Sequence, residues 1–168
     1  RTSSIPTDHP AFAETEKEVS ERISRLMNIK GKQTVESFHK RLGKIMWDKC
    51  GMARNAEGLK QAIEEIRALK AEFWSDVKIP GEINEFNPEL DKAGRVADFI
   101  ELGELMCIDA LNRNESCGGH FREESQTEEG EAKRDDENYS FVSAWELKSD
   151  GNWELHKEAL SFEIVKPT

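Results

Sequence analysis

The side chains best placed for polar chemistry lie in one loop in the last third of the chain. His120 and Arg122 follow a pair of glycines, and Arg134 and Asp135 come after an intervening acidic run. An imidazole, two guanidiniums and a carboxylate can hold two segments together through charge-assisted hydrogen bonds. One hypothesis is therefore that these four residues dock the loop onto another domain. The alternative, which composition alone favours, is a solvated loop with incidental charges.

The same loop contains half of a zinc-binding pattern. Cys117 and His120 are separated by two residues, but a structural zinc ion takes four ligands. The other candidate ligands are Cys50, Cys107, His39 and His156. None of these forms a second pair at ligand spacing, and the acidic pairs between residues 123 and 137 do not follow the order of a calcium-binding loop. We therefore interpret Cys117 and His120 as ordinary loop residues and expect no metal.

The sequence contains none of the common motifs for cofactor binding or catalysis. It has no G-x-G-x-x-G and no G-x-x-x-x-G-K-S/T, and nothing in it matches G-x-S-x-G or H-E-x-x-H. Its glycine pair, Gly118-Gly119, follows a helical pattern instead of opening a helix after a strand, which makes a poor phosphate cradle. We therefore expect neither catalytic nor cofactor-binding residues here, and we predict that the chain alone is not an enzyme.

Composition narrows the class of partner. The formal net charge is −10, and 35% of the residues are charged. An acidic surface repels nucleic acids and anionic membranes, and no apolar run reaches the roughly 18–20 residues of a membrane span. Three cysteines fit a reducing compartment, and Cys50 and Cys107 fall in apolar helical patterns where cysteine acts as a small hydrophobe. Because the chain begins with Arg1 rather than Met, we expect a segment of a larger protein.

Four stretches of the first two-thirds have apolar residues at helical spacing, with capping signals at their ends. The expected helices begin at Pro10, after Thr34, after Asn55 and at Pro88, and they end near Gly31, Gly51, Val77 and Asn112. Asp8 is close enough to cap the first helix. In the last helix Leu102, Leu105 and Ile108 widen the apolar face, so we expect this helix to be the most buried.

The C-terminal part changes to a strand pattern. Apolar and polar residues alternate over 139–147 and again from Trp153 to Ile164, and Asp150-Gly151 between them is a hairpin turn signal. The predicted fold class is mainly α: an antiparallel three- to four-helix bundle followed by a C-terminal β-hairpin. Within one domain we expect a helical bundle over 1–114, the Gly-Gly motif and acidic loop over 115–138, and over 139–168 a hairpin arm packed on the bundle or on a missing domain.

Two stretches of the sequence resemble a known family. The chain contains Arg113-Asn114-Glu115-Ser116-Cys117-Gly118-Gly119-His120-Phe121-Arg122 and, after the acidic stretch, Arg134-Asp135-Asp136. This resembles the C-terminal region of the flavoprotein subunit of succinate dehydrogenase and fumarate reductase, whose pattern is E-S-R-G-A-H-x-R, an acidic stretch and R-D-D. A second match is Ile45-Met46-Trp47 followed by Gly51-Met52-Ala53-Arg54-Asn55. The resemblance runs from about His39 to Val165, and the long insertion is similar to that of anaerobic bacterial members.

The motif loop departs from the family pattern at two positions. Cys117 stands where the family usually has Arg, which removes a fork-shaped donor, and Gly119 stands where it usually has Ala. The four docking candidates named above remain in place.

The resemblance implies a parent subunit that binds FAD covalently and interconverts succinate and fumarate. It further implies that the flavin and dicarboxylate sites lie in other domains, so that this chain has no FAD-binding or catalytic residue of its own. The implied partners are the flavin-binding domain of the same chain and an iron–sulfur subunit, with no nucleic acid and no direct membrane insertion. The implied location is cytoplasmic, at the inner face of the bacterial membrane.

Two other interpretations stay open from the sequence. L-aspartate oxidase carries a similar motif loop, although the Ile45-Met46-Trp47 region and the long acidic loop fit it less well. A free-standing acidic helical adaptor that binds a basic partner belongs to a different class and would need no flavoprotein parent.

Overall fold

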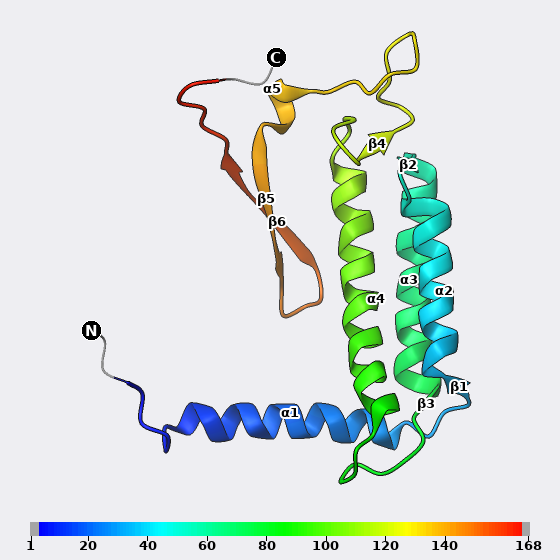
Figure 1. The fold of residues 1–168 in the computed structure, drawn as a ribbon, viewed down its shortest axis with the longest axis vertical. Coiled ribbons are helices and arrows are strands. Elements are labelled where there is room, and N and C mark those ends of the chain that lie inside the picture. Colours follow the sequence, from blue (N-terminus) through cyan, green and yellow to red (C-terminus); the bar gives the residue numbers. More distant parts are fainter. Residues whose placement is uncertain (1–3, 166–168) are drawn as a thin grey trace. The chain divides into compact units, whose positions relative to one another are not determined.

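The computed structural model describes residues 4–165, half of which lie in the long helices α1 to α4 (Figure 1). In chain order the elements are α1 (Pro10–Asn28), β1 (Gln33–Thr34), α2 (Val35–Cys50), β2 (Ala53–Arg54), α3 (Ala56–Asp76), β3 (Val77–Lys78), α4 (Pro88–Asn112), β4 (Phe121–Arg122), α5 (Asp136–Tyr139), β5 (Phe141–Leu147) and β6 (Trp153–Ala159). The predicted fold class, helices followed by a C-terminal hairpin, is confirmed. No helix of the described part is long and apolar enough to cross a membrane.

The chain divides into two compact units. The first comprises the chain up to Lys44 together with Ile66–Leu102, and the second comprises Ile45–Glu65 together with the chain from Gly103 onward. The helices α2, α3 and α4 each contribute one part to each unit.

Capping side chains set the starts of the long helices, as the sequence predicts. Each of three caps accepts a hydrogen bond from the amide three residues on: Thr34 from Ser37 (3.2 Å), Asn55 from Gly58 (2.7 Å) and Asn87 from Leu90 (3.0 Å). At α1 the cap is His9, whose Nδ1 accepts from the amide of Ala11 at 3.2 Å, and the expectation of Asp8 is wrong. Pro10 is the first helical residue, so Asp8 lies one position too early to cap it.

The first unit has an aromatic core. Phe38 of α2 meets Phe73 of α3 edge to face, with ring centroids 5.3 Å apart, and both rings are fully buried. The short strands β1 and β3 pair in parallel at its end. The backbone of Gly31 reaches the same place, where its amide donates to the carbonyl of Val77 at 3.1 Å. This approach leaves no room for a side chain: a Cβ on Gly31 would lie 1.9 Å from the carbonyl oxygen of Asp76.

Only one face of α4 is buried. Its apolar residues Phe99, Leu102 and Met106 remain exposed, whereas α3 buries its whole stripe of large apolar residues between positions 59 and 73. The expectation that the last long helix is the most buried is therefore wrong. A wide apolar pattern shows how much surface a helix could bury, but neighbouring elements of the described chain cover only part of it.

The second unit ends in the hairpin. β5 and β6 are antiparallel, with Phe141 opposite Ala159 and Leu147 opposite Trp153, and the turn places Gly151 at φ +83°. The alternation that predicts a strand up to Ile164 is wrong beyond Ala159. The residues before Ser140 form the short helix α5, so the pairing ends with one hydrogen bond from the amide of Leu160 to the carbonyl of Ser140 at 3.0 Å.

Candidate functional site

The motif loop is fixed to the segment between α2 and α3. β4 pairs in parallel with β2, and Arg54 lies opposite Arg122 in the register; the two strands lie side by side in Figure 1. Within the loop, the amides and carbonyls of Cys117 and His120 exchange hydrogen bonds of 2.8 and 3.1 Å. Gly118 sits at φ +58°, the left-handed region that glycine adopts without strain. The loop is therefore a defined turn with a fixed register.

Arg122 lies inside the unit. Its side chain is 3% exposed, and its Nε donates to Glu124 at 3.0 Å. Its Nη1 donates to three carbonyls at the end of α4: Ala110 (2.9 Å), Leu111 (3.2 Å) and Arg113 (3.4 Å). A helix leaves its last carbonyls without partners and carries partial negative charge there, and α4 has no basic residue in its last turn. Arg122 thus supplies from β4 the cap that α4 lacks.

His120 is held in one protonation state by its two neighbours. Its Nε2 lies 2.8 Å from the carbonyl of Arg113, which can only accept, and its Nδ1 lies 2.9 Å from Nη1 of Arg54, which can only donate. The ring therefore carries its proton on Nε2 and is neutral. Burial lowers the pKa of His120 below its ordinary value of 6.5, and the positive charges of three nearby arginines lower it further.

This environment predicts a pH dependence of folding. Below pH 6.5 His120 is protonated in the unfolded chain but stays neutral in the folded chain. The contribution of His120 to the free energy of unfolding is therefore fully present above pH 6.5 and is lost as the pH falls from 6.5 toward the lowered pKa. We expect His120→Gln, which can donate to Arg113 and accept from Arg54 without titrating, to lose less stability between pH about 7.5 and about 5.5. Urea unfolding at the two pH values measures this. The exposed His39→Gln is the control, and a His120→Gln curve parallel to the wild type would contradict the assignment.

Arg134 and Asp135 lie in a different group of contacts. Asp135 caps α5, where its carboxylate accepts from the amide of Asn138 at 3.2 Å, and its own amide donates to Glu115 at 2.9 Å. Arg134 pairs with Asp136 at 2.6 Å, and both side chains keep substantial exposure. The structure therefore brings His120 and Arg122 together at one carbonyl, and it places Arg134 and Asp135 at the other end of the acidic loop.

Arg113 links the two groups, and the site hypothesis built from the sequence does not include it. Its carbonyl receives His120 and Arg122, while its guanidinium donates to the buried carboxylate of Glu115 at 2.6 Å and to the carbonyl of Tyr139 at 3.3 Å. Arg113 and Glu115 belong to the motif quoted above, and Arg54 belongs to the second match. Their place in these matched stretches could have identified them as site residues. Residue type alone, however, does not show which carbonyl each side chain reaches.

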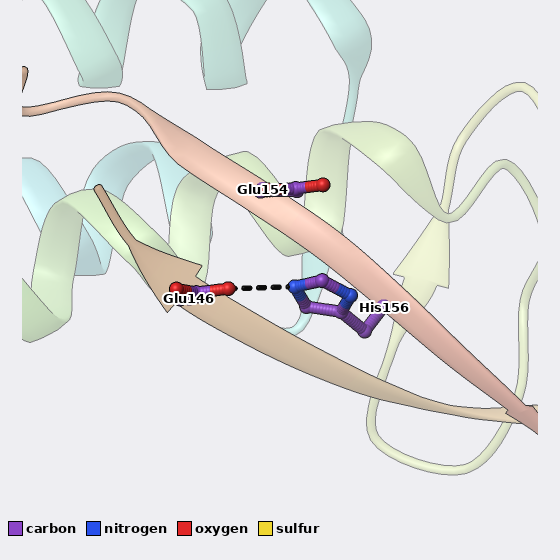
Figure 2. Close-up of side chains that lie close together, drawn as sticks. All are labelled: Glu146, Glu154 and His156. Atoms are coloured by element: carbon purple, nitrogen blue, oxygen red, sulfur yellow. Dashed lines mark hydrogen bonds and ion pairs between the residues drawn. The ribbon is translucent and has the colours of Figure 1, made fainter.

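Two arrangements could suggest a metal. At Cys117 and His120, both imidazole nitrogens already have partners, so the ring has no free lone pair to offer. On the hairpin, Figure 2 shows Glu146 facing His156, with Glu154 beside them; their donor atoms lie within 4.8 Å of one another, and all three are exposed. Lys148 pairs with Glu146 at 3.1 Å and with Glu154 at 2.5 Å, so an ammonium already balances these carboxylates. We interpret the second group as cross-strand charge pairing.

Comparison with known proteins defines the class first. A family described as fumarate reductase flavoprotein C-term matches residues 39–168. The fumarate reductase flavoprotein subunit of Proteus vulgaris is 28% identical over 134 residues, which are 80% of this chain and 22% of that protein. L-aspartate oxidase of Synechocystis sp. is 28% identical over 131 residues, 67% of this chain and 23% of that protein. The chain belongs to the family of C-terminal domains of fumarate reductase flavoproteins, and the resemblance found in the sequence is confirmed.

The fold agrees with this membership. A solved structure of E. coli quinol fumarate reductase superposes with a TM-score of 0.84 at 24% identity, covering 98% of this chain and 27% of that one. At that identity the likeness concerns the fold. The chain spans about a quarter of the length of the relatives that it matches.

The flavin that the family name implies does not fit the residues described here. Dinucleotides bind at the carboxyl edge of a parallel sheet beside a glycine-rich turn that opens a helix. The sheets of the described chain are pairs of strands, and the parallel pairs β1–β3 and β2–β4 are two residues long. We therefore derive no chemical step through a flavin in this chain.

Proposed function

We propose that this chain is the non-catalytic interface domain at the C-terminal end of a flavoprotein subunit that interconverts succinate and fumarate through FAD. The observation that carries the proposal is the family match over residues 39–168. The Proteus relative is one subunit of a fumarate reductase, which supports partner subunits here, and the expected partner is an iron–sulfur protein. The proposed location is the cytoplasmic side of the membrane that holds the complex.

Exposed apolar side chains beside the motif loop support an interface. Trp47 is 84% exposed and Met52 is 76% exposed, and the carbonyl of Met52 accepts from the amide of Phe121 in the loop at 3.3 Å. Large apolar side chains grouped at a surface mark contact sites. The proposed occupant is the flavin-binding domain of the same chain, with 1–114 as the helical part, 115–138 as the docking loop and 139–168 as the arm.

The four candidates have two roles in this proposal. His120 and Arg122 hold the loop from within, through the end of α4. Arg134 offers an exposed guanidinium to the other domain, and Asp135 fixes the turn from which Arg134 projects. A guanidinium suits such a contact because it makes paired hydrogen bonds to a carboxylate.

The test of the function uses the full-length flavoprotein. We expect it to reduce fumarate with a reduced dye and to oxidise succinate, and not to oxidise aspartate. Production of iminoaspartate from aspartate would instead support the L-aspartate oxidase alternative, which the Synechocystis relative favours. A full-length protein without bound flavin or either activity would reject both.

Variants in the same protein test the docking role. We expect Arg134→Ala and His120→Ala to lower the retained flavin and the fumarate reductase activity severalfold by loosening the contact. The matched control is Arg95→Ala, because Arg95 is exposed and pairs with Asp91 one turn away on the same helix. Unchanged flavin content, activity and subunit assembly in Arg134→Ala and His120→Ala would reject the docking assignment.

A further inference from the structure

Two buried cysteines meet in the second unit. Cys50 is the last residue of α2 and Cys107 lies in α4; they are 5% and 0% exposed. Met46 lies one turn before Cys50, with its sulfur 3.9 Å from that of Cys107. Three sulfur atoms from two helices therefore gather in one place, and two of them are free thiols.

The surroundings give the two thiols different roles. The neighbouring Cys107 thiol and, less strongly, the positive charge of Arg54 lower the pKa of Cys50 to about 7. The neighbouring Cys50 thiol, burial and the negative charge of Glu104 raise the pKa of Cys107. At neutral pH a substantial fraction of Cys50 is therefore thiolate, whereas Cys107 is a neutral thiol. A thiolate in contact with a second thiol is the arrangement in which oxidation ends in a disulfide instead of a higher acid.

We propose that Cys50 and Cys107 are a reversible oxidation site, at which hydroperoxides convert the two thiols to a disulfide that joins α2 to α4. This site goes beyond the proposed interface function and needs neither flavin nor a partner subunit. Cys50 is 5% exposed at the end of its helix, so the proposed oxidant is a molecule as small as hydrogen peroxide.

The chemistry balances with peroxide as the oxidant. The Cys50 thiolate attacks one peroxide oxygen, the O–O bond breaks, and hydroxide leaves and takes a proton to become water. The Cys107 sulfur then attacks the sulfenic sulfur of Cys50, the S–O bond breaks, and a second water leaves with the Cys107 proton. The two thiols together lose two electrons and two protons, and the peroxide becomes two molecules of water.

The bond would lie close to the motif loop. Gly51 follows Cys50, and its carbonyl accepts from Nε of Arg54 at 2.6 Å. Arg54 in turn contacts His120. Oxidation would therefore tie the end of α2 to α4 next to Arg54, whose contacts with Gly51 and His120 hold the loop.

The test treats the full-length protein with hydrogen peroxide, alkylates the remaining thiols and maps the peptides by mass spectrometry. We expect a peptide pair linked through Cys50 and Cys107, lost on treatment with dithiothreitol and formed equally in Cys117→Ser. The exposed Cys117 is the internal control for general oxidation. The proposal would be overturned if Cys50 and Cys107 were both recovered alkylated, and therefore unoxidised, while Cys117 was oxidised. Irreversible sulfinic acid at Cys50 would also overturn it.

Single variants test the order of attack. Cys107→Ser keeps a hydroxyl donor beside Cys50, and after peroxide we expect dimedone to label its Cys50 sulfenic acid. In Cys50→Ser, labelling of Cys107 should be about tenfold lower, because Cys107 is 0% exposed and burial disfavours its thiolate. Equal labelling in the two variants would reject Cys50 as the attacking sulfur. Peptide mapping of the wild-type protein tests for the disulfide even if a variant folds poorly.

Discussion

Replacing Arg122 by Ala is expected to destabilise the folded chain by about 3 kcal/mol. The change removes one guanidinium from the carbonyls of Ala110, Leu111 and Arg113 at once. Buried carbonyls left without donors cost about 1–3 kcal/mol, and hydrogen bonds from a charged donor contribute about 1.5–3 kcal/mol each. The bond to Glu124 adds little, because that carboxylate is 40% exposed and water screens it.

Urea unfolding followed by circular dichroism measures the Arg122 effect. Arg122→Lys should fall between the wild type and Ala, since an ammonium keeps the charge but cannot span the same carbonyls and Glu124. Arg95→Ala is the matched control, with an expected change within about 0.5 kcal/mol. If Arg122→Ala and Arg95→Ala unfold at the same urea concentration, Arg122 does not cap α4. The same comparison separates folding from docking, because Arg134→Ala should leave the unfolding curve unchanged.

The second large effect is expected at Gly31, where Ala should cost about 2–3 kcal/mol. A Cβ there would lie 1.9, 2.0 and 2.5 Å from the carbonyl oxygen, carbonyl carbon and Cα of Asp76. All three are backbone atoms, so no side chain can rotate out of the way. The segments must move apart, which weakens the hydrogen bond from Gly31 to Val77 and the one from the amide of Lys32 to Asp76.

Another glycine in the same unit provides the control for Gly31. Gly43 lies within α2, and a Cβ there would meet nothing within 4 Å. Gly43→Ala should therefore stabilise the chain by about 0.5–1 kcal/mol, because Ala loses less backbone entropy in a helix. The two substitutions are chemically identical and have opposite expected signs. A Gly31→Ala protein as stable as the wild type would show that the backbone at Asp76 yields easily.

The features that could be predicted from the sequence are local ones. Thr34, Asn55 and Asn87 cap helices because the amide that each reaches is three residues away, and the Asp150-Gly151 turn likewise acts within a few residues. The site residues could be selected through the family resemblance, whose motif contains them. The hydrogen-bond partners of these residues could not be predicted. The contact of Arg122 with the end of α4 depends on the path that the loop takes back to the helix after it.

The features that the sequence did not reveal are close approaches between distant segments. Strands of two residues, such as β1 and β3, have no periodicity to detect. Burial of Cys50 and Cys107 was predictable from the apolar pattern, but the meeting of their thiols required the relative rotation of two helices. Gly31 shows the same limit, since nothing near it in sequence indicates that Asp76 will lie against it.

The parallel pairing of β2 with β4 also has a kinetic consequence. It joins residues 53–54 to residues 121–122, with α3 and α4 in between, so it has a high contact order. The entropy of closing so long a loop is lost before the pairing returns any stabilisation, and the intervening helices gain their own contacts earlier. We therefore expect the motif loop to form late in folding, on the native side of the barrier. Changes within it should act on the rate of unfolding and leave the rate of folding almost untouched.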